Sequence, residues 1–177
     1  MNQTLFSFFY SFAHQSSALD ATIVFVAQDL VWVILVALFF YLLRDKEWHQ
    51  SFRTIVLIFG SAGVAVGSAI LFKDFFHTAR PFIEFSWVQP LISESGFAFP
   101  SGHTTLLAAL AAASWFEYKN TSMILGILAV IVGISRIMVG VHWPIDIAGG
   151  LVIGSIVSIV AYRIGDRLLP NVKKSLY

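Results

Sequence analysis

Residues 21–43 read ATIVFVAQDLVWVILVALFFYLL, a run of 23 residues in which Asp29 is the only charged side chain. A run of about 20 apolar residues is long enough to cross the hydrocarbon core of a bilayer as a helix. Four further apolar segments follow along the chain, at residues 54–72, 104–116, 122–139 and 145–164. The sequence therefore predicts an all-α, polytopic membrane protein with about five transmembrane helices. Asp29 either faces a packed neighbouring helix or marks a kink.

The composition supports the same fold class. Hydrophobic residues make up 58% of the 177 residues, charged residues make up 12%, and the mean hydropathy is +0.81. This charged fraction is roughly half the share usual in soluble proteins, which excludes a water-soluble globule. A net charge of +1 without a basic patch argues against nucleic-acid binding. The absence of cysteine excludes disulfides, thiolate metal sites and a cysteine nucleophile.

The N-terminal stretch predicts a helix that lies in the membrane interface. Within residues 2–17, polar residues recur at helical spacing opposite an aromatic-rich face. The polar set is Thr4, Ser7, Ser11 and His14, and the apolar set is Leu5, Phe8, Phe9 and Phe12. The stretch lacks the basic start and small-residue cleavage site of a signal peptide, so we expect it to be retained. The length suits one domain, residues 1–177.

Small residues in two predicted spans favour close helix packing. The second span contains Gly60, Gly63 and Gly67. The third contains Ala108, Ala109, Ala111, Ala112 and Ala113. The third span is also short for a bilayer of about 30 Å, so it either begins below the surface or takes its first turn from residues 101–103.

The basic residues predict the orientation, since Lys and Arg are retained in short cytoplasmic loops. Five spans place eight of the eleven on one side: Arg44, Lys46, Arg53, Lys119, Arg163, Arg167, Lys173 and Lys174. The other three, Lys73, Arg80 and Arg136, fall on the opposite side. A charged side chain near the bilayer centre costs about 2.5 to 3.5 kcal/mol on insertion scales, so these three need a partner or a function.

Two explanations for the three exceptions remain. Each side chain can snorkel into the headgroups, which is the commonest fate of a single Lys or Arg at a helix end. Alternatively, they bind an anion together, because only Asp146 among the nearby acids recurs with them at helical spacing. Guanidinium forks and a lysine ammonium suit the oxygens of a phosphate. We favour the anion.

Residues 100–103, Pro-Ser-Gly-His, have the pattern of a helix start. Ser101 is suited to the N-cap position, and Gly102 allows a ligand to approach the backbone. The unpaired N–H groups of that first turn would face the same anion.

His142 and Asp146 are four residues apart, with Pro144 suited to an early helical position. The carboxylate can therefore orient one imidazole nitrogen and leave the other free to attack. A metal site is an alternative, with possible ligands His103, His142, Asp146, Asp74 and His77. Three cations around a divalent ion would add repulsion, so we expect neither a metal nor another cofactor.

Three groups of residues together resemble the signature of the type 2 phosphatidic acid phosphatase superfamily. They are Lys73-x6-Arg80-Pro81, then Pro100-Ser101-Gly102-His103, then Ser135-Arg136-x5-His142-x3-Asp146, a motif core spanning residues 73–146. The resemblance implies a metal-independent phosphatase that forms a phosphohistidine. It implies that His142 is the nucleophile, that Asp146 orients it and that His103 protonates the leaving oxygen. It also implies a phosphoryl-binding set of Lys73, Arg80, Ser101, Gly102 and Arg136, with Pro81, Pro100 and Ser135 setting the shape.

Within the superfamily, the short multispan chain resembles bacterial undecaprenyl diphosphate phosphatases, which recycle the lipid carrier of cell-wall peptidoglycan. The division of basic residues predicts a site on the extracytoplasmic face of the cell (inner) membrane. The resemblance implies a lipid diphosphate substrate. Phosphatidylglycerophosphate, lipid A and diacylglycerol diphosphate remain alternative substrates. An anion-binding transporter and a structural membrane subunit are the competing functions, and neither needs an oriented nucleophile.

Several polar and aromatic residues receive no catalytic role from the sequence. Asp74, His77 and Glu84 lie in the long connection between the second and third spans. Glu94 is close enough in sequence to Ser101 to border the site. Trp87 and Trp143 are expected to be interfacial anchors.

Overall fold

The computed structural model describes residues 2–44 and 48–169, and every regular element in these ranges is helical, as predicted. The elements are α1 (Asn2–Tyr10), α2 (Ser17–Val24), the π-helical turn η1 (Phe25–Asp29), α3 (Leu30–Leu43), α4 (Trp48–Phe76), α5 (Pro81–Glu84), α6 (Gly102–Ser114), α7 (Lys119–Met138) and α8 (Pro144–Leu168).

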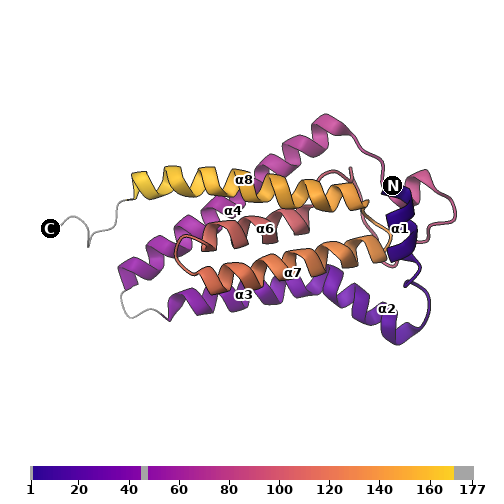
Figure 1. The fold of residues 1–177 in the computed structure, drawn as a ribbon, viewed down its shortest axis with the longest axis horizontal. Coiled ribbons are helices and arrows are strands. Elements are labelled where there is room, and N and C mark those ends of the chain that lie inside the picture. The colour runs from indigo at the N-terminus through magenta and orange to yellow at the C-terminus, as the bar shows by residue number, and fades with distance from the viewer. Residues whose placement is uncertain (1, 45–47, 170–177) are drawn as a thin grey trace.

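Within residues 2–44 and 48–169, four stretches have the length and composition to cross a membrane: Ser17–Leu43, Trp48–Glu84, Lys119–Met138 and Pro144–Leu168. The remaining predicted span, the third along the chain, is α6, whose 13 residues extend only about 20 Å at 1.5 Å per residue. This short helix lies in the middle of the bundle, in contact with α4, α7 and α8 (Figure 1). The chain is therefore an integral membrane protein whose described residues form four full-length spans, three of which pack against the short helix α6.

Glycines of α8 allow α6 to pack closely against it. A Cβ atom at Gly154 would lie 2.4 Å from the carbonyl oxygen of Thr105, so a side chain there would displace the α6 backbone. A Cβ atom at Gly150 would lie 3.0 Å from the carbonyl oxygen of Ser101. Nine of the thirteen α6 residues are buried, including most of its alanines. Close packing by small residues is thus confirmed for α6.

The same prediction is wrong for α4. A Cβ atom at Gly60, Gly63 or Gly67 would meet no atom of the described residues within 4 Å. These glycines lie on the outer face of α4, away from the central helix. Glycine spacing alone does not distinguish a packed face from an open one, because every face of a membrane helix is apolar.

Helix α1 is shorter than predicted, since it ends at Tyr10 and a turn leads to α2. The side chains of Leu5, Phe8 and Phe12 are exposed, as the predicted interfacial face requires. Phe6 is fully buried, however, because α1 packs across the ends of α7 and α8 (Figure 1). The helix therefore has an inward-facing contact that its amphipathic pattern does not indicate.

Asp29 ends the π-helical turn and is exposed, which excludes the alternative that it faces a packed helix. A π-helical turn interrupts the regular α-helix, which agrees with the alternative that Asp29 marks an irregularity in this span.

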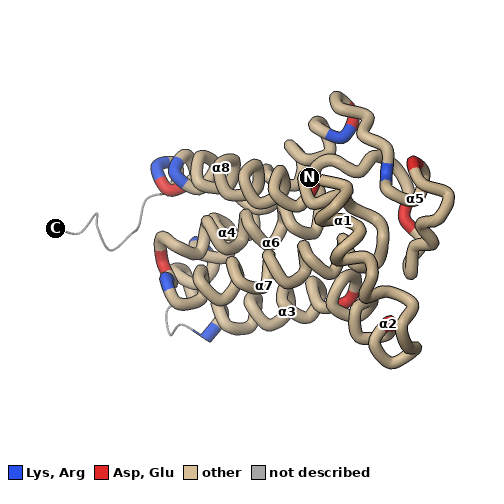
Figure 2. The backbone as a smooth tube through the Cα atoms, turned by 45° about the vertical axis from the view of Figure 1, so that its right-hand side comes forward, with Lys and Arg blue, Asp and Glu red and all other residues tan. Residues whose placement is uncertain are grey.

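Charged residues gather toward the two ends of the bundle, and its middle is uncharged in the view of Figure 2. Five of the eight residues predicted on one side are at the end that holds the α6–α7 connection: Arg44, Arg53, Lys119, Arg163 and Arg167. Lys46, Lys173 and Lys174 lie outside the described residues. Lys73, Arg80 and Arg136 lie at the opposite end, so the division of charge is confirmed.

Candidate functional site

All the candidate site residues come together at one end of the bundle. Lys73 is in the last turn of α4, Arg80 precedes α5, and Arg136 is in the last turn of α7. Residues 101–103 begin α6, and residues 142–146 lead into α8. Because the helices alternate in direction, the helix ends that carry these residues meet at the same end of the molecule (Figure 1). The fold thus brings three separate motifs together.

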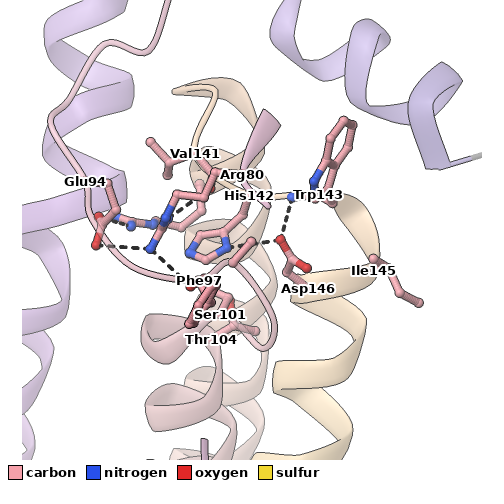
Figure 3. A network of polar contacts seen from close by, with 12 residues as sticks. Arg80, Glu94, Phe97, Ser101, Thr104, Val141, His142, Trp143, Ile145 and Asp146 are labelled. Carbon is pink, nitrogen blue, oxygen red and sulfur yellow. Dashed lines mark hydrogen bonds and ion pairs between the residues drawn. The ribbon is translucent and has the colours of Figure 1, made fainter. Parts of the chain in front are cut away.

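His142 and Asp146 form a buried pair. Nδ1 of His142 lies 3.2 Å from Oδ2 of Asp146, and the two side chains are 2% and 0% exposed. The same carboxylate oxygen accepts a hydrogen bond from the backbone N–H of Trp143 at 2.8 Å, which caps the start of α8. The carboxylate is therefore held by the helix start, and it in turn orients the imidazole (Figure 3). Nε2 of His142 has no hydrogen-bond partner among the described residues.

Arg80 holds the loop that precedes α6. Its Nε donates to the carbonyl of Gly96 at 2.9 Å, and its NH2 donates to the carbonyl of Ser95 at 3.0 Å. NH1 donates to the carbonyl of Val141 at 3.0 Å, one residue before His142. Figure 3 shows this guanidinium beside the imidazole of His142. Arg80 thus joins the 95–97 loop to the turn that carries the histidine.

Lys73 contacts the same loop from α4. Its Nζ donates to the carbonyl of Phe97 at 2.6 Å and lies 3.4 Å from that of Ala98. Because this loop runs directly into Ser101, Lys73 also fixes the entry to α6.

Glu94 bridges the two arginines. Its carboxylate accepts a hydrogen bond from NH2 of Arg136 and lies 3.6 Å from NH2 of Arg80. NH1 of Arg136 lies 3.4 Å from the carbonyl of Ala27 in the π-helical turn, and its buried Nε has no protein partner among the described residues. The only sequence signal for Glu94 was its position shortly before Ser101, which did not predict this bridge.

Ser101 occupies the N-cap position of α6, as predicted. Its hydroxyl makes no bond to the helix N–H groups and instead accepts one from the Thr104 hydroxyl at 3.2 Å. The N–H of Ser101 donates to the carbonyl of Asp146 at 3.0 Å, which connects the starts of α6 and α8. The first N–H groups of α6 therefore remain available to a ligand.

Burial and neighbouring cations keep both histidines neutral in the free protein. Burial lowers the pKa of His142 well below its ordinary value, and the charges of Arg136, Arg80 and Lys73 lower it further. Burial, followed by the charge of Arg136, lowers the pKa of His103 to about 4. Burial alone would raise the pKa of Glu94, but the charge and hydrogen bond of Arg136 hold it below its ordinary value. Glu94 is therefore ionised, and His142 has a free lone pair at neutral pH.

The five possible metal ligands do not form one cluster. Asp74 and His77 are exposed, and residues 2–44 and 48–169 contain no group of three or more His, Asp or Glu side chains at metal-binding spacing. Glu84 is also exposed.

The expectation that Trp143 is an interfacial anchor is wrong. Its side chain is only 5% exposed, because it packs against Phe6 and Phe85. Its indole N–H donates to the carbonyl of Ala79 at 3.0 Å. Trp87 is 50% exposed, as an interfacial side chain should be.

The chain is similar to several known proteins. The model of the PAP2 superfamily matches residues 53–169. Undecaprenyl-diphosphatase BcrC of Bacillus subtilis (strain 168) is 31% identical over 176 residues, covering 97% of this chain and 88% of that protein. Phosphatidylglycerophosphatase B of the same organism is 32% identical over 136 residues, covering 71% and 61%. The crystal structure of Aquifex aeolicus LpxE has a TM-score of 0.73 at 27% identity, covering 92% and 94%.

The family model matches more than half of the chain, and one relative aligns with nearly all of it. The fold is shared with a solved structure. The chain therefore belongs to the PAP2 superfamily and is a lipid phosphatase of the PAP2 type.

Proposed function

We propose that the protein removes the terminal phosphate of undecaprenyl diphosphate, yielding undecaprenyl phosphate, through a phosphohistidine on His142. The observation that carries the chemistry is the buried His142–Asp146 pair beside the Arg80–Glu94–Arg136 bridge. A protein that only binds or transports an anion needs the cations, but it has no use for an oriented imidazole with a free nitrogen.

In the first step, Nε2 of His142 attacks the terminal phosphorus. The P–N bond forms, and the bond to the bridging oxygen breaks with its electron pair passing to the lipid phosphate. Asp146 accepts the Nδ1–H of His142 and stabilises the positive charge that develops on the ring. His103 donates a proton to the leaving oxygen.

In the second step, a water molecule attacks the phosphohistidine. His103, now neutral, takes a proton from that water as the new P–O bond forms. The P–N bond breaks, its electron pair returns to Nε2, and phosphate leaves. The pKa of His103, about 4 in the free protein, means that a bound phosphate must raise it before His103 can act as an acid.

The phosphoryl oxygens are bound by Lys73, Arg80, Arg136, Ser101 and the N–H groups at Gly102. Three cations in this region face two carboxylates, Glu94 and Asp146, so an excess of one positive charge remains when the histidines are neutral. This excess favours a phosphate group and provides the charge stabilisation that metal ions supply in many other phosphoryl-transfer enzymes. We therefore propose that the reaction needs no metal ion.

The choice of substrate rests on similarity, because a relative that aligns with 97% of the chain is named an undecaprenyl-diphosphatase. Phosphatidylglycerophosphate is the second candidate, because another relative is named a phosphatidylglycerophosphatase. The division of basic residues supports placing the site on the extracytoplasmic face of the cell (inner) membrane.

One assay tests both reaction and substrate. Phosphate release by the purified protein is measured with undecaprenyl diphosphate, undecaprenyl phosphate and phosphatidylglycerophosphate, each with excess EDTA. We expect release from the diphosphate at the highest kcat/KM and no loss in EDTA. Preference for phosphatidylglycerophosphate would reject undecaprenyl diphosphate as the main substrate. Loss of activity in EDTA that a divalent ion restores would reject the metal-free mechanism. No release from any lipid would favour an anion-binding role.

A labelling experiment tests the orientation separately. A single cysteine in the exposed connection, as in Ser86→Cys, should react with an impermeant reagent added to intact cells. A cysteine at Asn120, near the opposite end, should not react. The reverse pattern would contradict an extracytoplasmic site.

A further inference from the structure

The turn that carries His142 is held from outside by α1. This turn runs from Gly140, two residues after the end of α7, to Asp146 in the first turn of α8. Three side chains of α1 contact it at three different points, before and after His142.

The first contact is between Phe6 and Trp143, the residue after His142. Phe6 is 0% exposed, and its ring centroid lies 5.0 Å from that of Trp143. The backbone N–H of Trp143 donates to Asp146, the carboxylate that orients His142. A shift of Trp143 therefore moves the backbone next to His142, and it also moves the Asp146 carboxylate that contacts the imidazole.

The second contact is between Tyr10 and Gly140. Gly140 has a positive φ of 83°, and a Cβ atom there would lie 3.0 Å from the Tyr10 ring. The Tyr10 hydroxyl is itself fixed, since it donates to the carbonyl of Gln89 and accepts from its N–H, both at 2.9 Å. Tyr10 therefore supports the beginning of the turn.

The third contact is a hydrogen bond at the beginning of α8. The side-chain oxygen of Asn2 accepts from the N–H of Ile145 at 3.2 Å. The first N–H groups of a helix have no partner within the helix, so Asn2 satisfies one of them.

We propose that α1 is a positioning element for the nucleophile, with Phe6 as its principal positioning residue. The inference rests on the proposed role of His142. Phe6 packs in a buried cluster with Val88, Ala98, Ile137, Trp143 and Ile147, none of which is proposed to bind phosphate. Removing its ring leaves a space beside Trp143, which allows the turn to move while the cations of α4 and α7 keep their places. A displacement of a reacting group by about 1 Å can cost up to about 100-fold in rate.

The test compares Phe6→Ala with Phe8→Ala, a matched change on the exposed face of the same helix, where Phe8 is 59% exposed. We expect Phe6→Ala to lower kcat about 10- to 100-fold and Phe8→Ala to leave it near the wild-type value. Phe6→Leu, which keeps apolar volume against Trp143, should recover most of the loss. Asn2→Ala should lower kcat by only about threefold, the effect of one ordinary hydrogen bond, and Asn2→Asp should retain the acceptor.

Calorimetric titration with inorganic phosphate distinguishes positioning from loss of folded protein. Phe6→Ala should bind phosphate with the wild-type stoichiometry and with a Kd within about twofold of wild type, because the phosphate ligands are untouched. A parallel fall of stoichiometry and kcat would make Phe6 merely structural and overturn the inference, as would wild-type turnover in Phe6→Ala. Failure of the proposed function would differ from both, since the wild-type protein itself would then release no phosphate.

Discussion

Each end of the bundle contains a network of an arginine with carboxylates, but the two networks differ in charge balance. At the end away from the site, NH1 of Arg53 lies 3.6 Å from Glu117, and NH2 pairs with Asp166. Glu117 also accepts a hydrogen bond from the Tyr162 hydroxyl at 2.7 Å. One guanidinium there faces two carboxylates. At the site, three cations face Glu94 and Asp146.

The burial of the two networks differs as well. The side chain of Arg53 is 13% exposed and its partner Asp166 is 48% exposed, so water reaches that network. The side chains of Arg80 and Arg136 are 3% and 1% exposed. An uncompensated charge is far more costly when it is buried. The fold therefore retains a buried positive excess at the end where a phosphate would neutralise it, whereas the partly hydrated network at the other end has more carboxylates than guanidinium groups.

The largest expected effect tests whether the site end is catalytic. His142→Ala should abolish the phosphoenzyme and lower turnover by about 10⁴-fold or more, because the nucleophile is lost. A labelled phosphoryl group is trapped on the protein under conditions that preserve phosphohistidine, and the labelled residue is identified by mass spectrometry. His103→Ala should be partly rescued by an aryl phosphate, whose leaving group needs less protonation, whereas His142→Ala should not be. A label on His103, or on no histidine, would contradict these roles.

The next effect compares the two networks directly through the same substitution. Arg80→Lys should lower kcat/KM about 100-fold, because a lysine cannot reproduce the three separate donors to Gly96, Ser95 and Val141. Arg53→Lys should lower the thermal unfolding midpoint and leave kcat/KM of the folded protein near wild type. Equal kinetic effects at both ends would mean that the two networks are both structural.

A smaller effect concerns the pKa of His103, which is about 4 in the free protein. Bound phosphate adds negative charge that favours the protonated imidazole, so the pKa should rise by at least about one unit. NMR titration of the His103 ring with and without inorganic phosphate measures the shift, with chloride at equal ionic strength as the control. By linkage, phosphate should bind more tightly as the pH falls through the raised pKa. An unchanged or lowered pKa would reject His103 as the substrate-recruited acid.

The smallest effect concerns one carboxylate in each network, Glu94 at the site and Glu117 at the other end. Glu94→Gln increases the positive excess at the site, so inorganic phosphate should inhibit about three- to tenfold more strongly. Glu117→Gln is the matched change at the other end and should leave phosphate inhibition unchanged. Weaker inhibition in Glu94→Gln would indicate instead that Glu94 is needed to orient the arginines for phosphate.

The sequence by itself determined the helical membrane class, the division of basic residues and the His142–Asp146 pair. These features depend on composition or on residues within one helical turn, where local geometry decides which side chains meet. The family signature named every cation of the site for a similar reason, since its spacing is local within each motif. Sequence could also assign Ser101 to a helix start, because capping is a local property.

Only the tertiary structure decided how these residues act on one another. Glu94 bridges Arg80 and Arg136, and it lies 42 residues before Arg136 in the sequence. Phe6, near the N-terminus, packs against Trp143, near the start of the last helix. Such contacts depend on how the helices pack, and no local pattern encodes them. In a membrane helix, moreover, apolar residues occupy every face, so hydrophobic periodicity cannot tell a packed face from one that meets lipid. For that reason Gly60 and Gly154 look alike in the sequence, yet only Gly154 lies against another helix.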